Sequence, residues 1–90
     1  MNLEWKEIEP SPMTWYQAKE IESESYRLPT LKELQDAYRN KVVGFQNSFL
    51  WTNDDKEDNW ERAWYYGFGN DQSGTLNKNM HFYVRLCKEI

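Results

Sequence analysis

Residues 53–61 have the types and spacing best suited to chemistry. These nine positions hold five acidic residues, one lysine and two asparagines. Carboxylate and amide oxygens are the ligands that Ca²⁺ prefers, so one hypothesis is a calcium site formed by Asn53, Asp54, Asp55, Glu57 and Asp58. The alternative is a solvated acidic loop, which has the same composition and needs no ion. We favour the solvated loop and expect neither a bound metal nor another cofactor.

An aromatic ring within this charged stretch indicates binding. Aromatic side chains beside amides and carboxylates are typical of glycan sites and of protein interfaces, and Trp60 has that setting. Alternatively, Trp60 folds back and covers the core. We predict a binding site on two polar loops, residues 53–61 and 70–79, formed by Asn53, Asp54, Asp58, Trp60, Tyr66, Asn70, Asp71 and Asn77.

The residues that catalysis needs do not form a recognisable pattern. His81 and Cys87 are the only histidine and cysteine, which is too few for a zinc site of the usual ligand types. The phosphate-binding and nucleophile motifs GxxxxGK[ST], GxGxxG and GxSxG do not occur. We therefore expect a protein without enzymatic activity.

Size and charge limit the class of protein. Ninety residues are enough for one domain, which we assign to residues 1–90. The net charge of −4 argues against direct nucleic-acid binding, because a protein that binds the phosphate backbone needs a basic surface. Aromatic residues make up 17% of the chain, so we expect a core built from a few large rings.

The single cysteine bears on location. Cys87 cannot form a disulfide within the chain, whereas a secreted domain of this size usually has several. The first ten residues lack the apolar run of a signal peptide, and no stretch reaches the roughly 20 apolar residues of a membrane span. We expect a cytoplasmic protein with no membrane partner.

Local patterns predict the elements that position these residues. Thr14 with Gln17 and Thr30 with Glu33 are capping boxes, which predict helices from Thr14 to about residue 23 and from Thr30 to about residue 40. Alternating or aromatic-rich stretches predict strands at residues 3–8, 49–52, 63–68 and 82–86. Helices followed by a run of strands indicate an α+β fold with an antiparallel sheet.

Five motifs, in order, span about residues 13–87: Met13-Thr14-Trp15-x-x-Ala18, Arg27-Leu28-Pro29-Thr30-x-x-Glu33-Leu34, Phe49-Leu50-Trp51-Thr52, Ala63-Trp64-Tyr65-x-x-Phe68 and Tyr83-Val84-Arg85-Leu86. Together they resemble a bacterial and phage family of unknown function that includes the C-terminal domain of the Legionella collagen-like adhesin. The resemblance implies a C-type-lectin-like fold, with two helices packed on a small twisted antiparallel sheet and with paired N- and C-terminal strands. It also implies recognition of a ligand or surface.

At the motif positions we expect core residues, namely Trp15, Leu28, Leu34, Trp64, Phe68 and Val84. We expect Arg27 to make structural hydrogen bonds. Two functions fit the sequence. The first is a binding module that recognises a protein or a small polar or glycan ligand through its acidic, aromatic loops. The second is a phage- or prophage-encoded inhibitor that binds and blocks a host protein, whose nucleic-acid site its acidic face could occupy.

Overall fold

Both helices begin at the capping boxes that the sequence predicts. The computed structural model describes residues 2–90, with α1 at Trp15–Glu20 and α2 at Leu31–Arg39. Thr14 and Gln17 exchange side-chain-to-backbone hydrogen bonds of 3.1 and 2.9 Å, and α2 has the same arrangement at Thr30. Within residues 2–90, neither helix has the length and apolar character needed to cross a membrane. The two-helix prediction is confirmed, although α1 ends earlier than expected.

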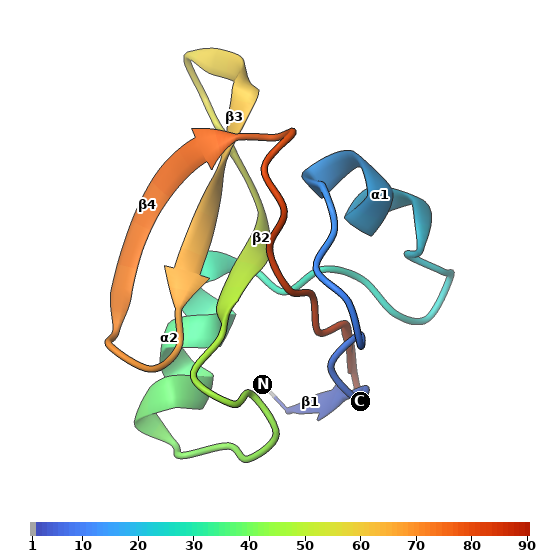
Figure 1. Cartoon of the computed structure of the whole chain (residues 1–90). Helices are drawn as coiled ribbons and strands as arrows, with labels where there is room; N and C mark the ends of the chain where they lie inside the picture. The colour runs from blue at the N-terminus through green and yellow to red at the C-terminus, as the bar shows by residue number, and fades with distance from the viewer. Residues whose placement is uncertain (1) are drawn as a thin grey trace.

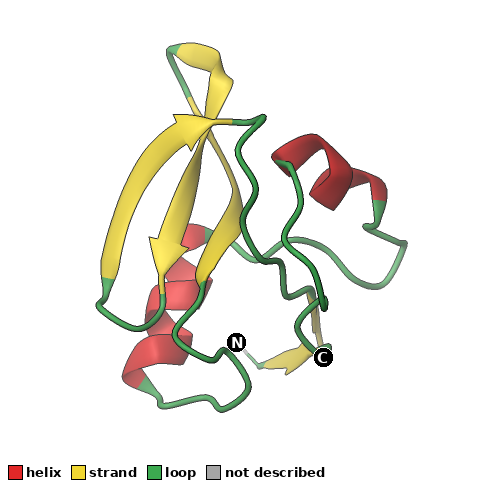
Figure 2. Cartoon of the chain, viewed as in Figure 1, coloured by secondary structure: helices red, strands yellow, loops and turns green. Residues whose placement is uncertain are grey.

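Five strands within the described residues form two antiparallel sheets (Figures 1 and 2). The larger sheet has the order β2–β3–β4, with strands at Phe49–Lys56, Asn59–Gly67 and Gln72–Asn77. In the smaller sheet, β1 (Leu3–Trp5) pairs with β5 (Cys87–Glu89). The predicted α+β class and the pairing of the two ends of the chain are confirmed.

The strand predicted over residues 82–86 is wrong. Phe82 makes an isolated antiparallel bridge to Met13, whereas Tyr83 makes a parallel bridge to Leu50, and β5 begins only at Cys87. Neighbouring residues of this segment thus pair with different partners on its two sides. No continuous ladder forms, although the alternation of side chains is typical of a strand.

The predictions that residues 53–61 and 70–79 form loops are also partly wrong. Residues 53–61, expected to be a loop, continue β2 and β3 as a hairpin that turns at residues 57 and 58. Residues 70–79, expected to be a hairpin connection, contain β4, which pairs with β3 from Arg62–Asn77 to Gly67–Gln72. Pairing with β3 outweighs the low intrinsic strand preference of Asn, Asp and Gly.

The core consists of two clusters on opposite faces of β2. Leu50 and Trp51 are adjacent, so their side chains point to opposite faces of the sheet. Trp51 packs near α1 with Trp15, Leu28 and Val84, whereas Leu50 packs near α2 with Leu34, Tyr66 and Phe68. Of the six predicted core residues, all but Trp64 are buried.

Arg27 connects the start of α2 to β5, which confirms the prediction that it makes structural hydrogen bonds. Its guanidinium donates two hydrogen bonds of 2.8 Å to the Glu33 carboxylate, one through each nitrogen. It also donates to Glu89 and lies 3.7 Å from the Cys87 sulfur. The backbones of Arg27 and Cys87 exchange two hydrogen bonds of 2.9 Å. Through these bonds Arg27 joins its own segment to α2 and to β5, although β5 is distant in sequence.

The pKa of Glu33 gives this connection a measurable pH dependence. Hydrogen bonds from Arg27 hold the pKa of the Glu33 carboxyl below its ordinary value of 4.5. A carboxyl with a lowered folded-state pKa stabilises the fold above its unfolded-state pKa, and that stabilisation is lost as the pH falls through the folded-state value.

We expect Glu33→Gln to be less stable than the wild type at pH 7 and to lose less stability between pH 4.5 and lower values. The measurement is urea unfolding at a series of pH values, with Glu24→Gln, at an exposed position after α1, as the control. Equal pH dependence in the wild type and Glu33→Gln would contradict this role for Glu33.

Candidate functional site

Trp60 lies on the β2–β3 hairpin, which projects from the body of the molecule (Figure 1). The β2–β3 register jumps from Lys56–Asn59 to Asp55–Ala63, so Trp60 sits in a bulge of β3. Bulges redirect side chains, and the Trp60 side chain is 72% exposed. The alternative in which this ring covers the core is therefore wrong, and the prediction of an exposed ring in a charged setting is confirmed.

A groove of about 650 Å³ runs along one side of the same hairpin, from Asn53 to the turn at Asp58, and we call it the hairpin groove. Leu31 and Trp64 supply its apolar surface. Four carboxylates, one lysine and one asparagine line the rest: Asp54, Asp55, Glu57, Asp58, Lys56 and Asn53. Trp64 is half-buried, so the residue expected in the core instead exposes part of its ring beside these acids.

Three predicted site residues in the hairpin already have partners within the chain. Asn53 Oδ1 accepts a hydrogen bond of 2.7 Å from Lys19. Asp54 Oδ2 accepts one of 2.9 Å from the first backbone N–H of α2. Asp58 pairs with Lys56 at 2.6 Å, and this hydrogen bond lowers the pKa of the Asp58 carboxyl. The hairpin is thereby tied to both helices.

Tyr66 does not belong to an exposed site. Its side chain is fully buried in the second core cluster, and its hydroxyl donates a hydrogen bond to Asp71. Burial, followed by this hydrogen bond, raises the pKa of Tyr66 well above its ordinary value. Asp71 has a left-handed backbone with φ of 53° in the β3–β4 turn. Sequence alternation could not reveal that β3 is covered on both faces, so the prediction that Tyr66 is a binding residue is corrected.

Asn70 and Asn77 lie at opposite ends of β4. Asn70 is in the β3–β4 turn, where its amide donates to Gln72 at 3.2 Å. Asn77 pairs with Arg62 near the projecting hairpin, and its side chain accepts a hydrogen bond of 2.8 Å from the Asn79 backbone. The structure therefore brings Asn77 towards Trp60 but places Asn70 and Asp71 at the far end of the sheet. The prediction that all of these residues form one site is wrong, because Asn70 and Asp71 are separated from the others.

The titratable groups do not gather into a metal-binding cluster within residues 2–90. No three His, Cys, Asp or Glu side chains in this range are positioned to hold a metal ion. Cys87 is fully buried, and burial raises the pKa of its thiol to about 11. The group is therefore protonated at neutral pH, which leaves it a weak nucleophile.

A buried lysine that the sequence does not predict lies behind the hairpin. The side chain of Lys78 is only 5% exposed, with its Nζ 4.1 Å from the ring centroid of Trp15 and 3.4 Å from Asp55 Oδ2. This cation–π contact and ion pair link the end of β4 to α1 and to the hairpin. A lysine in an Asn-rich segment gives no sequence signal of burial.

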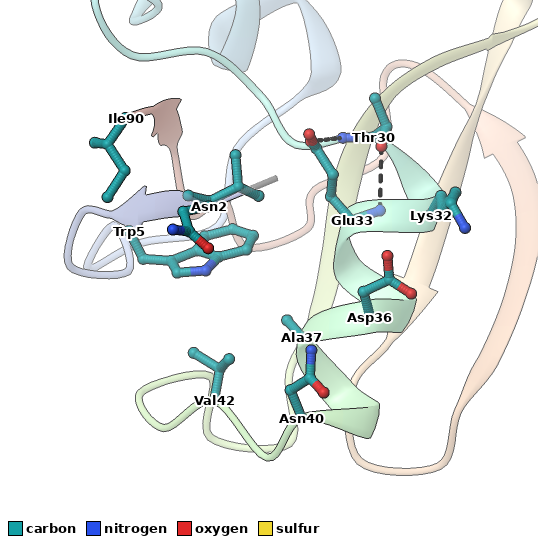
Figure 3. Close-up of a pocket in the computed structure, with 11 residues that line it drawn as sticks. Asn2, Trp5, Thr30, Lys32, Glu33, Asp36, Ala37, Asn40, Val42 and Ile90 are labelled. Atoms are coloured by element: carbon teal, nitrogen blue, oxygen red, sulfur yellow. Dashed lines mark hydrogen bonds between the residues drawn. The ribbon is translucent and has the colours of Figure 1, made fainter.

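A second groove, of about 660 Å³, lies between β1 and α2, and we call it the β1–α2 groove. Figure 3 shows the Trp5 ring facing α2 across from Ala37, with Val42 at the lower end. Asn2 and Ile90 lie on the β1 side. These residues are distant in sequence and share no motif, so no local pattern could predict the groove.

Comparison with known proteins finds no match for this chain, either among protein-family models or among curated protein sequences.

The buried hydroxyl of Tyr66 gives a direct test of its structural role. We expect Tyr66→Phe to lower the free energy of unfolding by about 1–2 kcal/mol, because Asp71 loses the hydrogen bond that it accepts. Tyr83→Phe changes an exposed ring and should stay within about 0.5 kcal/mol of the wild type. Urea unfolding of both variants checks this, and a Tyr66→Phe variant as stable as the wild type would contradict a stabilising role for the buried hydroxyl.

Proposed function

We propose that this protein is a non-enzymatic binding module that recognises a partner protein through the β2–β3 hairpin. The observation that carries the proposal is the 72% exposure of Trp60 on a projecting, bulged hairpin. Tryptophan is enriched among the few residues that supply most of the binding energy of interfaces. Residues Asn53, Asp54 and Asp58 of the predicted site remain part of this surface, together with Asn77.

The fixed setting of the hairpin supports the proposal. Hydrogen bonds from Lys19 to Asn53 and from the α2 backbone to Asp54 hold the hairpin base against both helices. Lys78 adds an ion pair to Asp55 from behind. A ring presented on a braced hairpin loses little conformational entropy when it binds, which raises affinity.

The charge of the hairpin groove indicates the chemistry of the partner. Four carboxylates and one lysine line it, and Trp64 offers a ring that a lysine or arginine of the partner could approach. A basic protein surface fits this charge. The same acidity favours the second candidate, an inhibitor of phage or prophage origin that occupies the nucleic-acid site of a host protein. A glycan ligand has less support, since Tyr66 is buried and Trp60 is left as the one exposed ring of the predicted site.

The finer fold assignment belongs to the same proposal. Paired terminal strands, two helices and a separate three-stranded sheet are compatible with a C-type-lectin-like fold and with the family that the motifs resemble. The buried, unpaired Cys87 suits a reducing compartment such as the cytoplasm.

We expect Trp60→Ala to weaken capture of the partner by about 30-fold or more, as loss of an interface hot spot of 2 kcal/mol would. The wild type, Trp60→Ala and Tyr83→Ala are immobilised and compared for retention of a stoichiometric protein from a lysate of the source organism. Tyr83→Ala removes an exposed ring elsewhere and should retain the partner. Unfolding of Trp60→Ala should change by less than about 0.5 kcal/mol.

Retention that is unchanged in Trp60→Ala would refute the hairpin as the binding surface. With the captured protein in hand, displacement of its bound nucleic acid by this chain would select the inhibitor over a simple binding module. Hits on a glycan array that depend on Trp60 would instead support a glycan as the ligand.

A further inference from the structure

The outer edge of β1 carries backbone groups without partners among residues 2–90. Lys6 N–H donates to Leu86 O at 2.9 Å, and Ile90 N–H donates to Asn2 O at 3.3 Å. In an antiparallel ladder, hydrogen-bonded and non-hydrogen-bonded pairs alternate. With the register Leu3–Glu89 and Trp5–Cys87, the amides and carbonyls of Leu3 and Trp5 therefore point away from β5. No residue in the described part of the chain hydrogen-bonds to these four groups.

From this edge we infer a second binding site: an extended peptide segment of a partner protein adds to β1 as a strand and places apolar side chains over the β1–α2 groove. Strand addition at an open sheet edge is a recurring mode of peptide recognition, in which the backbone supplies affinity and pockets for alternate side chains supply specificity. The inference does not depend on the hairpin, which lies on other elements.

The groove lies on the face to which such a peptide would direct its side chains. Leu3 and Trp5 both line the groove, whereas Glu4, between them, does not. A residue added opposite Leu3 or Trp5 points to the same face as its neighbour across the strands. Every second side chain of the added strand would therefore extend over Trp5, Ala37 and Val42.

The charge of the groove favours apolar side chains in the occupant. Glu33 is neutralised by its two hydrogen bonds with Arg27, and the remaining charged residues that line the groove, Lys32 and Asp36, have opposite signs. The volume of about 660 Å³ is in the range of ligand sites. A peptide with alternating apolar residues complements this neutral surface better than a basic or acidic one.

The length of the edge favours a peptide over a second copy of this chain. β1 has three residues, so its edge is about 10 Å long. Pairing two such edges provides only a few hydrogen bonds, whereas a stable interface between folded proteins buries at least about 1,200 Å². A flexible peptide can follow the edge and also fill the adjoining groove.

The probe is a phage-displayed library of random dodecapeptides, selected on the immobilised full chain, from which an enriched peptide is synthesised. We expect enriched peptides to alternate apolar and polar residues. Leu3→Pro removes the outward N–H while leaving the hydrogen bonds between β1 and β5 in place, and it should weaken binding of the synthetic peptide at least about fivefold. Leu3→Val keeps the N–H and an apolar side chain, so its affinity should stay within about twofold of the wild type.

Hydrogen exchange of the wild type tests the same geometry without a substitution. The amides of Leu3 and Trp5 should exchange faster than that of Glu4 in the free chain and should become protected when the peptide binds. The inference is overturned if no peptide family is enriched, if Leu3→Pro binds as tightly as Leu3→Val, or if these two amides stay unprotected in the complex. Their protection through self-association of the free chain would also overturn it, in favour of a dimer.

Discussion

The bidentate ion pair between Arg27 and Glu33 is the constraint on which the rest of the structure depends. One carboxylate receives two hydrogen bonds from the guanidinium and one from the Thr30 N–H, so it closes the start of α2 and holds Arg27 at the same time. Through its backbone, Arg27 extends the β1–β5 sheet at Cys87. The terminal sheet and α2, which form the two walls of the β1–α2 groove, thus share one anchor. A charged pair with bidentate geometry gives direction as well as strength, which apolar packing in so small a domain does not supply.

Most of the aromatic residues form the core or pack against it, and a few rings are exposed. Rings such as Trp51, Phe45 and Tyr66 are buried on the two faces of the larger sheet, where their size compensates for the shortage of aliphatic side chains. Trp60 is the large ring that the fold exposes most, and it lies on a bulge rather than in a regular ladder. The acidic residues beside it are partly used to brace the hairpin, so the charge of this region serves both the fold and the proposed recognition.

Sequence predicted what is local and missed what depends on distant pairing. The capping boxes at Thr14 and Thr30 specify helix starts within four residues, and both were found. Alternation predicts a strand over residues 82–86, but it does not show that the pairing partners change from Phe82 to Tyr83. For the candidate site, the exposed Trp60 was predicted from its charged neighbours. The burial of Tyr66 and the β1–α2 groove could not be, since residues remote in sequence create both.

Site-specific photo-crosslinking in the living source organism tests the recognition role of Trp60 most directly. A photoreactive phenylalanine analogue replaces Trp60 in one variant and Tyr16, an exposed ring on α1, in another. We expect one dominant protein adduct from position 60 upon irradiation and none of that mass from position 16. Equal adducts from both positions, or none from position 60, would contradict the hairpin as the surface through which this protein acts.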